Sequence, residues 1–187
     1  MRAYVEIARR VGAPFLRVVV DGRGAEPSPE ECVALLGPLM PQFDAAGVRL
    51  AIENHDRFSA AALAGIVEAL GVDRAGVCLD TVNSFGALEG PEAVVDRLAP
   101  YTLNLHVKDF TIARVSSQMG FVIGGCPAGR GRLDVPWLLG RLRECGRDVN
   151  AVIESWTPFG PDLEATLARE AAWAEESVRF LRQYIAE

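Results

Sequence analysis

The chain has 187 residues, half of them hydrophobic, with 25 acidic residues against 19 basic ones. That length is enough for one well-buried domain. The net charge of −6 and the lack of a basic run argue against a nucleic-acid partner, because such binding depends on Lys and Arg meeting phosphates. No apolar run approaches the ~20 residues of a membrane span, and the first residues do not resemble a signal peptide. With four widely spaced cysteines that fit reduced thiols, we expect a cytoplasmic protein with no membrane partner.

Short apolar strands alternate with segments of helical spacing along the whole chain. Helices are predicted at residues 2–11, 28–47, 59–70, 91–99, 134–146 and 163–185. Strands are predicted at residues 15–20, 48–53, 76–80, 103–108 and 150–154. The fourth strand is followed by a long segment, 111–132, that we predict to be irregular.

The strands are too apolar to have one face in water, which predicts parallel strands covered by helices. An open doubly wound sheet and a (β/α) barrel both fit this pattern. Polar residues at several strand ends favour the barrel, and no Gly-rich phosphate loop follows any strand. A complete barrel typically needs ~250 residues, and only about five of its eight units are predicted here. We therefore expect residues 1–187 to form a single partial TIM-barrel domain. Either the N-terminal units are absent from this chain, or the partial barrel closes against another chain as a homo-oligomer.

Four of the predicted strands carry an ionisable side chain at their C-terminal end: Glu53, Asp80, His106 and Glu154. If parallel neighbours bring these ends together, the three carboxylates cannot all stay ionised without a cation. Oxygen-rich ligation with one nitrogen favours one divalent metal ion, Mn²⁺, Mg²⁺ or Co²⁺, and Zn²⁺ is a further candidate. The alternative is that each carboxylate is simply solvated or caps a helix.

Further polar side chains near the same strand ends are candidates for a substrate pocket. His55 shares a strand face with Glu53, and Lys108 shares one with His106, because alternate residues of a strand point to the same side. The predicted substrate-binding residues are His55, Arg57, Asn83, Lys108, Arg130 and Trp156. Segment 111–132 is too long for a plain connector, and we expect it to form a lid over the metal centre. The alternatives are a structural role for His55, solvent exposure for Lys108 and a solvated loop.

Five ordered segments resemble the motifs of one family. They are Ile52-Glu53-Asn54-His55, Cys78-Leu79-Asp80-Thr81, His106-Val107-Lys108-Asp109, Gly129-Arg130-Gly131-Arg132-Leu133-Asp134 and Ile153-Glu154. The family is the xylose-isomerase-like TIM-barrel family, also described as the sugar phosphate isomerase/epimerase group. The resemblance implies that Glu53, Asp80, His106 and Glu154 bind one divalent metal ion. It also implies that Glu53 and Glu154 are the catalytic pair that transfers protons.

A metal that grips a carbonyl and a neighbouring hydroxyl acidifies the carbon between them by stabilising an enediolate. We therefore expect an enzyme, a metal-dependent isomerase or epimerase of a sugar, sugar acid or sugar phosphate. A dehydratase or decarboxylase of a keto-sugar acid would use the same chemistry. Lys108 and the arginines of segment 111–132 favour an acidic substrate. From a different class, a catalytically silent barrel fragment would act as a binding module.

Overall fold

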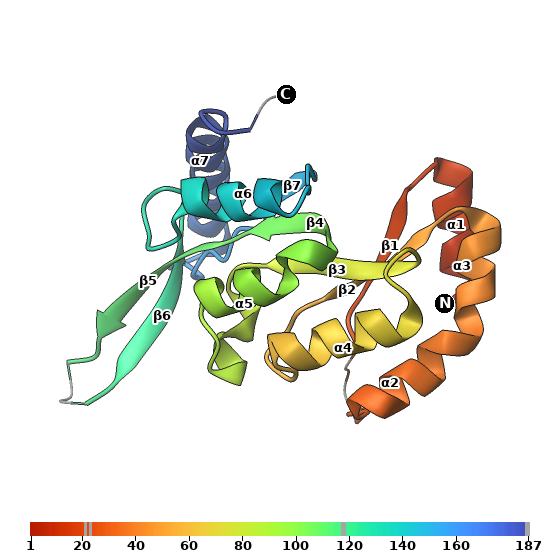
Figure 1. The fold of residues 1–187 in the computed structure, drawn as a ribbon. Helices are drawn as coiled ribbons and strands as arrows, with labels where there is room; N and C mark the ends of the chain where they lie inside the picture. Colours follow the sequence, from red (N-terminus) through yellow and green to blue (C-terminus); the bar gives the residue numbers. More distant parts are fainter. Residues whose placement is uncertain (21, 23, 117–118, 186–187) are drawn as a thin grey trace.

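The structure, a computed structural model, describes residues 1–20, 22, 24–116 and 119–185. Five parallel strands form one sheet in the order β1-β2-β3-β4-β7 (Figure 1). Their bounds are Phe15–Val18 (β1), Arg49–Glu53 (β2), Ala75–Asp80 (β3), Thr102–Val107 (β4) and Ala151–Ile153 (β7). A separate antiparallel pair joins β5 (Asp109–Arg114) and β6 (Phe121–Cys126). The parallel strands make a half-barrel, which confirms the predicted partial TIM barrel.

Helices connect the strands at the predicted places. Their bounds are Arg2–Val11 (α1), Pro29–Leu36 (α2), Met40–Ala46 (α3), Ala60–Leu70 (α4), Pro91–Leu98 (α5), Val135–Glu144 (α6) and Leu163–Leu181 (α7). Short 3₁₀ turns occupy Gly37–Leu39 (η1), Asn83–Ala87 (η2) and Ala99–Tyr101 (η3). The single helix predicted at 28–47 is divided into α2, η1 and α3, because Pro38 and Pro41 lack the N–H that would continue an α-helix. None of the helices in the described ranges is long and apolar enough to cross a membrane.

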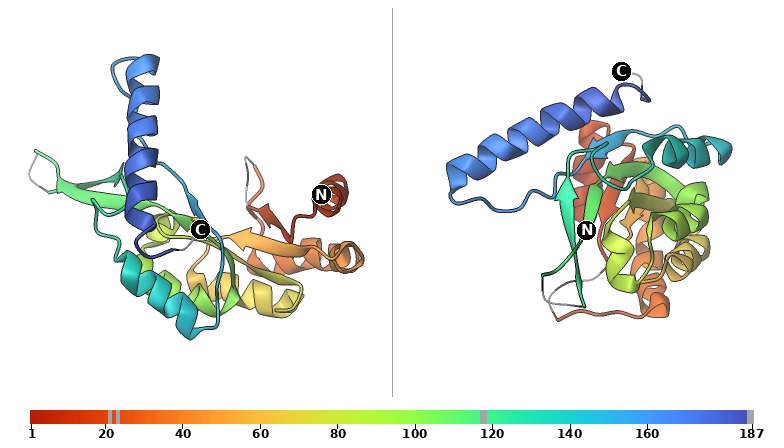
Figure 2. Two further views of the ribbon diagram at one scale, coloured as in Figure 1. Left: turned by 90° about the horizontal axis from the view of Figure 1, so that it is seen from above. Right: turned by 90° about the vertical axis from the view of Figure 1, so that its left-hand side faces the viewer.

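Strand residues alternate between two environments. One set points into a hydrophobic core with the helices, and it includes Leu50, Ile52, Val77, Leu79, Leu105 and Val107. The other set faces the concave side of the sheet, where Ala51, Cys78 and Asn104 precede the polar strand ends. Helices α2 to α6 follow one another along the outer side of the curved sheet, and α7 stands apart from them (Figure 2). The fold therefore buries apolar residues on one face and presents the ionisable ones on the other.

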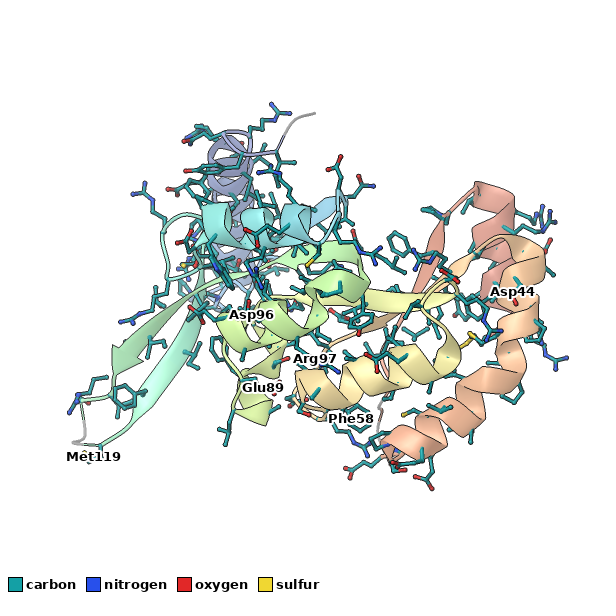
Figure 3. All side chains as sticks on the ribbon, viewed as in Figure 1. Asp44, Phe58, Glu89, Asp96, Arg97 and Met119 are labelled. Atoms are coloured by element: carbon teal, nitrogen blue, oxygen red, sulfur yellow. The ribbon has the colours of Figure 1, made fainter. Side chains whose placement is uncertain are left out.

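Much of the segment after β4 is regular, so the prediction of an irregular stretch at 111–132 is wrong for residues 111–114 and 121–126. Strands β5 and β6 pair along their whole length as a hairpin. Residues 117–118 of the segment lie outside the described part of the chain. The hairpin projects from the body of the molecule, and Met119 near its tip is 89% exposed (Figure 3). The tip of the hairpin is therefore exposed to solvent, and the lid role expected for segment 111–132 stays a prediction.

A buried carboxylate fixes the chain between the hairpin and α6. Asp109 is 3% exposed, and its Oδ1 accepts the backbone N–H groups of Phe110 at 2.8 Å and Leu133 at 3.0 Å. Its Oδ2 accepts those of Gly129 and Gly131, both at 2.9 Å. A Cβ on Gly131 would overlap the Asp109 carboxylate. The glycine at 131 is thus explained by the close approach of the backbone to this side chain, whereas Gly129 has a φ of 86° and a Cβ there would overlap the ring of Phe180.

Candidate metal centre

Four side chains from four neighbouring strands meet at the carboxyl end of the sheet. One ligand atom from each of Glu53, Asp80, His106 and Glu154 lies within 4.8 Å of all the others. Nδ1 of His106 is 3.2 Å from Oε1 of Glu53 and 2.8 Å from Oε2 of Glu154. The same nitrogen is 4.0 Å from Oδ2 of Asp80. The expected convergence is present, and this donor set is able to hold one divalent cation.

Asp80 shows how the strand ends prepare this group for a cation. Its side chain is fully buried, and its Oδ1 accepts the backbone N–H groups of Val82 at 2.8 Å and Asn83 at 2.9 Å. Its Oδ2 faces the other ligands and has no hydrogen-bond partner among the described residues. The Lys108 ammonium is 3.0 Å away, as an ion pair without hydrogen-bond geometry. A buried oxygen without a hydrogen bond is costly unless a cation satisfies it, so the residues fit a metal ion.

A buried amide, not predicted as a functional residue, joins the ends of β2 and β3. Asn54 is 1% exposed, and its Oδ1 accepts the backbone N–H of Asp80 at 2.7 Å. Its Nδ2 donates to the carbonyl oxygen of Asp80 at 2.8 Å and to Oγ of Ser84 at 2.9 Å. The sequence signal was its place directly after Glu53, where a buried polar residue needs partners. Asn54 therefore sets the positions of two candidate ligands relative to each other.

The four candidate ligands and their neighbours shift one another's pKa values. Burial raises the pKa of Asp80. Burial also acts to raise the pKa of Glu53, but the hydrogen bond with His106 and the charge of Arg17 lower it overall. The Cys78 thiol and then the Glu53 carboxylate raise the pKa of His106 to about 10. The arrangement thus holds Glu53 as a carboxylate and draws positive charge towards the centre.

A cavity of about 480 Å³ is lined by one of the four ligands, Glu154. Four of the predicted substrate-binding residues line it: His55, Asn83, Lys108 and Trp156. The 3₁₀ turn η2 adds Phe85 to the wall, and the base of the hairpin adds Ile123; neither was predicted from the sequence. A larger, mainly apolar cavity of about 780 Å³ lies beside β1 and α2, and none of the four ligands lines it. The smaller cavity is the better candidate for substrate, because polar groups converge on it.

The two other predicted substrate-binding residues lie outside this cavity. Arg57 lines an adjoining cavity of about 460 Å³ with His55, and its Nη2 donates to the carbonyl oxygen of Pro27 at 2.6 Å. Arg130 forms an ion pair with Glu176 of α7, and its side chain is 70% exposed. The structure does not bring Arg130 to the pocket, because Asp109 holds the backbone on both sides of that residue.

An arginine that was not predicted contacts a candidate ligand directly. Nη1 of Arg17, on β1, donates to Oε2 of Glu53. The parallel register places Arg17 opposite Ala51, two residues before Glu53 on the same face of β2. In the sequence it is one charged residue inside an apolar strand, and only the pairing of β1 with β2 reveals its position.

Gly125 allows the chain after β7 to lie against the hairpin. A Cβ at this position would overlap the carbonyl oxygen of Trp156 and lie 2.8 Å from its Cβ. We expect Gly125→Ala to lower the free energy of unfolding by about 1–3 kcal/mol through overpacking, measured by chemical denaturation. Gly140→Ala in α6 is the matched control, because a Cβ there meets nothing within 4 Å. That change should be neutral or stabilising by up to about 1 kcal/mol. Equal stability of the two variants would contradict the close contact.

Comparison with known proteins agrees with this geometry. A 3-oxo-isoapionate decarboxylase of Pectobacterium atrosepticum is 32% identical over 178 residues, which cover 95% of this chain and 65% of the relative. The chain therefore spans less than two thirds of that relative's length.

Two solved structures share the fold. A xylose isomerase-like TIM-barrel protein of Mycobacterium smegmatis in complex with magnesium has a TM-score of 0.67 at 13% identity, over 95% of this chain and 65% of that one. D-psicose 3-epimerase of Clostridium cellulolyticum H10, solved with D-tagatose, has a TM-score of 0.69 at 16% identity, over 97% of this chain and 68% of that one. A family model described as a xylose isomerase-like TIM barrel matches residues 1–184. The chain therefore belongs to the xylose isomerase-like TIM-barrel family.

Proposed function

We propose that this chain is a divalent-metal-dependent enzyme of keto-sugar acids, and that its reaction is the loss of CO₂ from a 3-oxo acid. The observation that carries the proposal is the convergence of Glu53, Asp80, His106 and Glu154 within 4.8 Å beside an open cavity. The decarboxylase of Pectobacterium atrosepticum supports this reaction, since its likeness extends over 95% of the chain.

The metal would be held by the four converging side chains, with Oδ2 of Asp80 as the oxygen that lacks another hydrogen bond. When bound, it supplies Lewis-acid polarisation of a substrate carbonyl, which stabilises charge on the carbonyl oxygen. The three carboxylates favour Mn²⁺, Mg²⁺ or Co²⁺, with Zn²⁺ as a further candidate. The magnesium complex of the Mycobacterium smegmatis protein supports a cation that prefers oxygen ligands.

The two glutamates differ in their freedom to exchange protons. The Glu53 side chain is 2% exposed and bonded to Arg17, whereas the Glu154 side chain is 41% exposed and lines the cavity. Decarboxylation breaks the bond between the carboxylate carbon and the carbon next to the carbonyl, and leaves the electron pair on the latter. One proton must then be added to that carbon. Glu154, the more exposed of the two glutamates, would donate it and recover a proton from water.

Isomerisation or epimerisation is the second candidate. Both glutamates lie within 3.2 Å of His106 Nδ1, and a pair of carboxylates can remove a proton on one side and return it on the other. The lowered pKa of Glu53 and its bond to Arg17 make it a weak base, because a proton must displace the guanidinium. A single solvent-accessible carboxyl group is sufficient for decarboxylation, which is why we place that reaction first.

The test uses the chain loaded with Mn²⁺ and two substrates. With 3-oxo-isoapionate we expect release of CO₂, and Glu154→Gln should lower kcat by about 100-fold or more, since general acid–base catalysis contributes that much. With D-psicose in D₂O, the second candidate predicts deuterium at the exchanged carbon. Deuterium incorporation without CO₂ release would favour the epimerase. If the Mn²⁺-loaded chain gives neither CO₂ release nor deuterium incorporation, the proposal that it is an enzyme is contradicted.

A further inference from the structure

Two cationic side chains, Lys108 and Arg17, flank the candidate metal centre. They differ in the number of N–H donors that remain available to a ligand. Lys108 donates to Oδ1 of Asn83 at 3.0 Å, and its Nζ is 3.0 Å from Asp80 and 3.3 Å from Glu154. Its side chain is 13% exposed. The ammonium thus has three oxygen neighbours, as many as it has N–H donors. Lys108 is therefore occupied in balancing the carboxylates.

Arg17 is placed differently. Its side chain is 45% exposed, and Glu53 is its one hydrogen-bond partner among the described residues. A guanidinium has several N–H donors in a planar fork, so Arg17 keeps donors on its exposed side. It lies on the face of the sheet that carries the four ligands and is bonded to Glu53, the more buried of the two glutamates. Its side chain lines a separate cavity of about 310 Å³.

The charge balance of the centre favours an anionic ligand. Three carboxylates face two permanent cations, Lys108 and Arg17. A divalent ion would leave this group with a surplus of positive charge, and a neutral sugar offers nothing to offset it. A carboxylate would, and a guanidinium binds a carboxylate through two parallel hydrogen bonds.

We propose that Arg17 binds the carboxylate of the substrate and makes the site selective for sugar acids over neutral ketoses. The inference rests on the proposed function and names the residue that recognises its acid group. It also gives a physical reason for product release. When the carboxylate leaves as CO₂, the product loses the charge that Arg17 holds, and its affinity falls.

The rival explanation is that Arg17 only orients Glu53. Binding measurements on the Mn²⁺-loaded chain distinguish the two explanations, with D-ribonate as the acidic probe and D-ribulose as the neutral one. We expect the wild type to bind D-ribonate more tightly than D-ribulose. Arg17→Met should weaken the binding of D-ribonate about 10- to 100-fold, as for the loss of a charge-assisted pair. The affinities for D-ribulose and for Mn²⁺, the latter followed by the electron paramagnetic resonance of the free ion, should stay nearly unchanged.

Arg17→Lys keeps the charge but not the fork, so it should recover part of the D-ribonate affinity. Arg9→Met is the matched control, because Arg9 pairs with Glu6 on the exposed surface of α1; it should leave every value unchanged. Equal losses for both probes together with weaker Mn²⁺ binding would overturn the proposal in favour of orientation of Glu53. Unchanged D-ribonate affinity in Arg17→Met, or a wild type with no preference for D-ribonate, would overturn it as well.

These outcomes are distinct from failure of the proposed reaction. If Arg17→Met selectively loses affinity for D-ribonate but the wild type releases no CO₂ from 3-oxo-isoapionate, the carboxylate-binding role of Arg17 is supported and the decarboxylase proposal is contradicted. Release of CO₂ by the wild type, together with unchanged D-ribonate affinity in Arg17→Met, would support the decarboxylase proposal and contradict the role of Arg17.

Discussion

Asp109→Ala should destabilise the chain by about 3 kcal/mol or more, which is the largest stability loss we expect from a single polar substitution. The carboxylate accepts four backbone N–H groups, from Phe110, Gly129, Gly131 and Leu133. Alanine would leave these donors without a partner in the space that the side chain fills, and each buried donor left unpaired costs about 1–3 kcal/mol.

The measurement is thermal unfolding followed by circular dichroism. For a chain of this size, a loss of that amount corresponds to a fall in Tm of roughly 6–12 °C. Asp134→Ala is the control, because Asp134 caps α6 through one bond to the Trp137 N–H and should cost about 1 kcal/mol. If Asp109→Ala melts no lower than Asp134→Ala, the carboxylate does not hold this part of the chain together.

The half-barrel could be predicted from the sequence because its signals are local. Each parallel strand is a short apolar run, and each of the four candidate ligands stands at the end of such a run, where parallel neighbours bring side chains together. The helix breaks at Pro38 and Pro41 were also readable, since proline cannot continue a helix. The prediction of one helix from 28 to 47 ignored that signal.

The hairpin and Arg17 depend on contacts between distant residues, and no local pattern reports them. Strand β6 contains two glycines, is exposed or half-buried along its length, and gains its regular structure by pairing with β5. Arg17 gains its position from the register with β2, which places it beside Glu53. Arg130 was predicted to bind substrate, but Asp109 fixes the backbone around it and its side chain pairs with Glu176, outside the 480 Å³ cavity.

Asp80→Asn should abolish the response of the chain to divalent metal. The change keeps the shape of the side chain and the oxygen that accepts the Val82 and Asn83 N–H groups. It replaces Oδ2, the buried oxygen without a hydrogen bond, by an amide nitrogen that cannot bind a cation. Loss of an outer partner of a metal ligand typically costs about 10–100-fold in affinity, so loss of the ligand atom itself should cost about 100-fold or more.

The readout is the shift of Tm on addition of Mn²⁺. A ligand present at 100 times its Kd stabilises the folded state by about 2.7 kcal/mol, so wild type should melt higher with metal and Asp80→Asn should not. Asp96→Asn is the matched control, because Asp96 of α5 pairs with Arg141 on the surface. It should retain the full shift. An equal shift in Asp80→Asn would show that the cation binds elsewhere. A wild type that neither binds nor responds to Mn²⁺, Mg²⁺, Co²⁺ or Zn²⁺ would instead favour the catalytically silent module, in which the three carboxylates are balanced by Lys108, Arg17 and His106 alone.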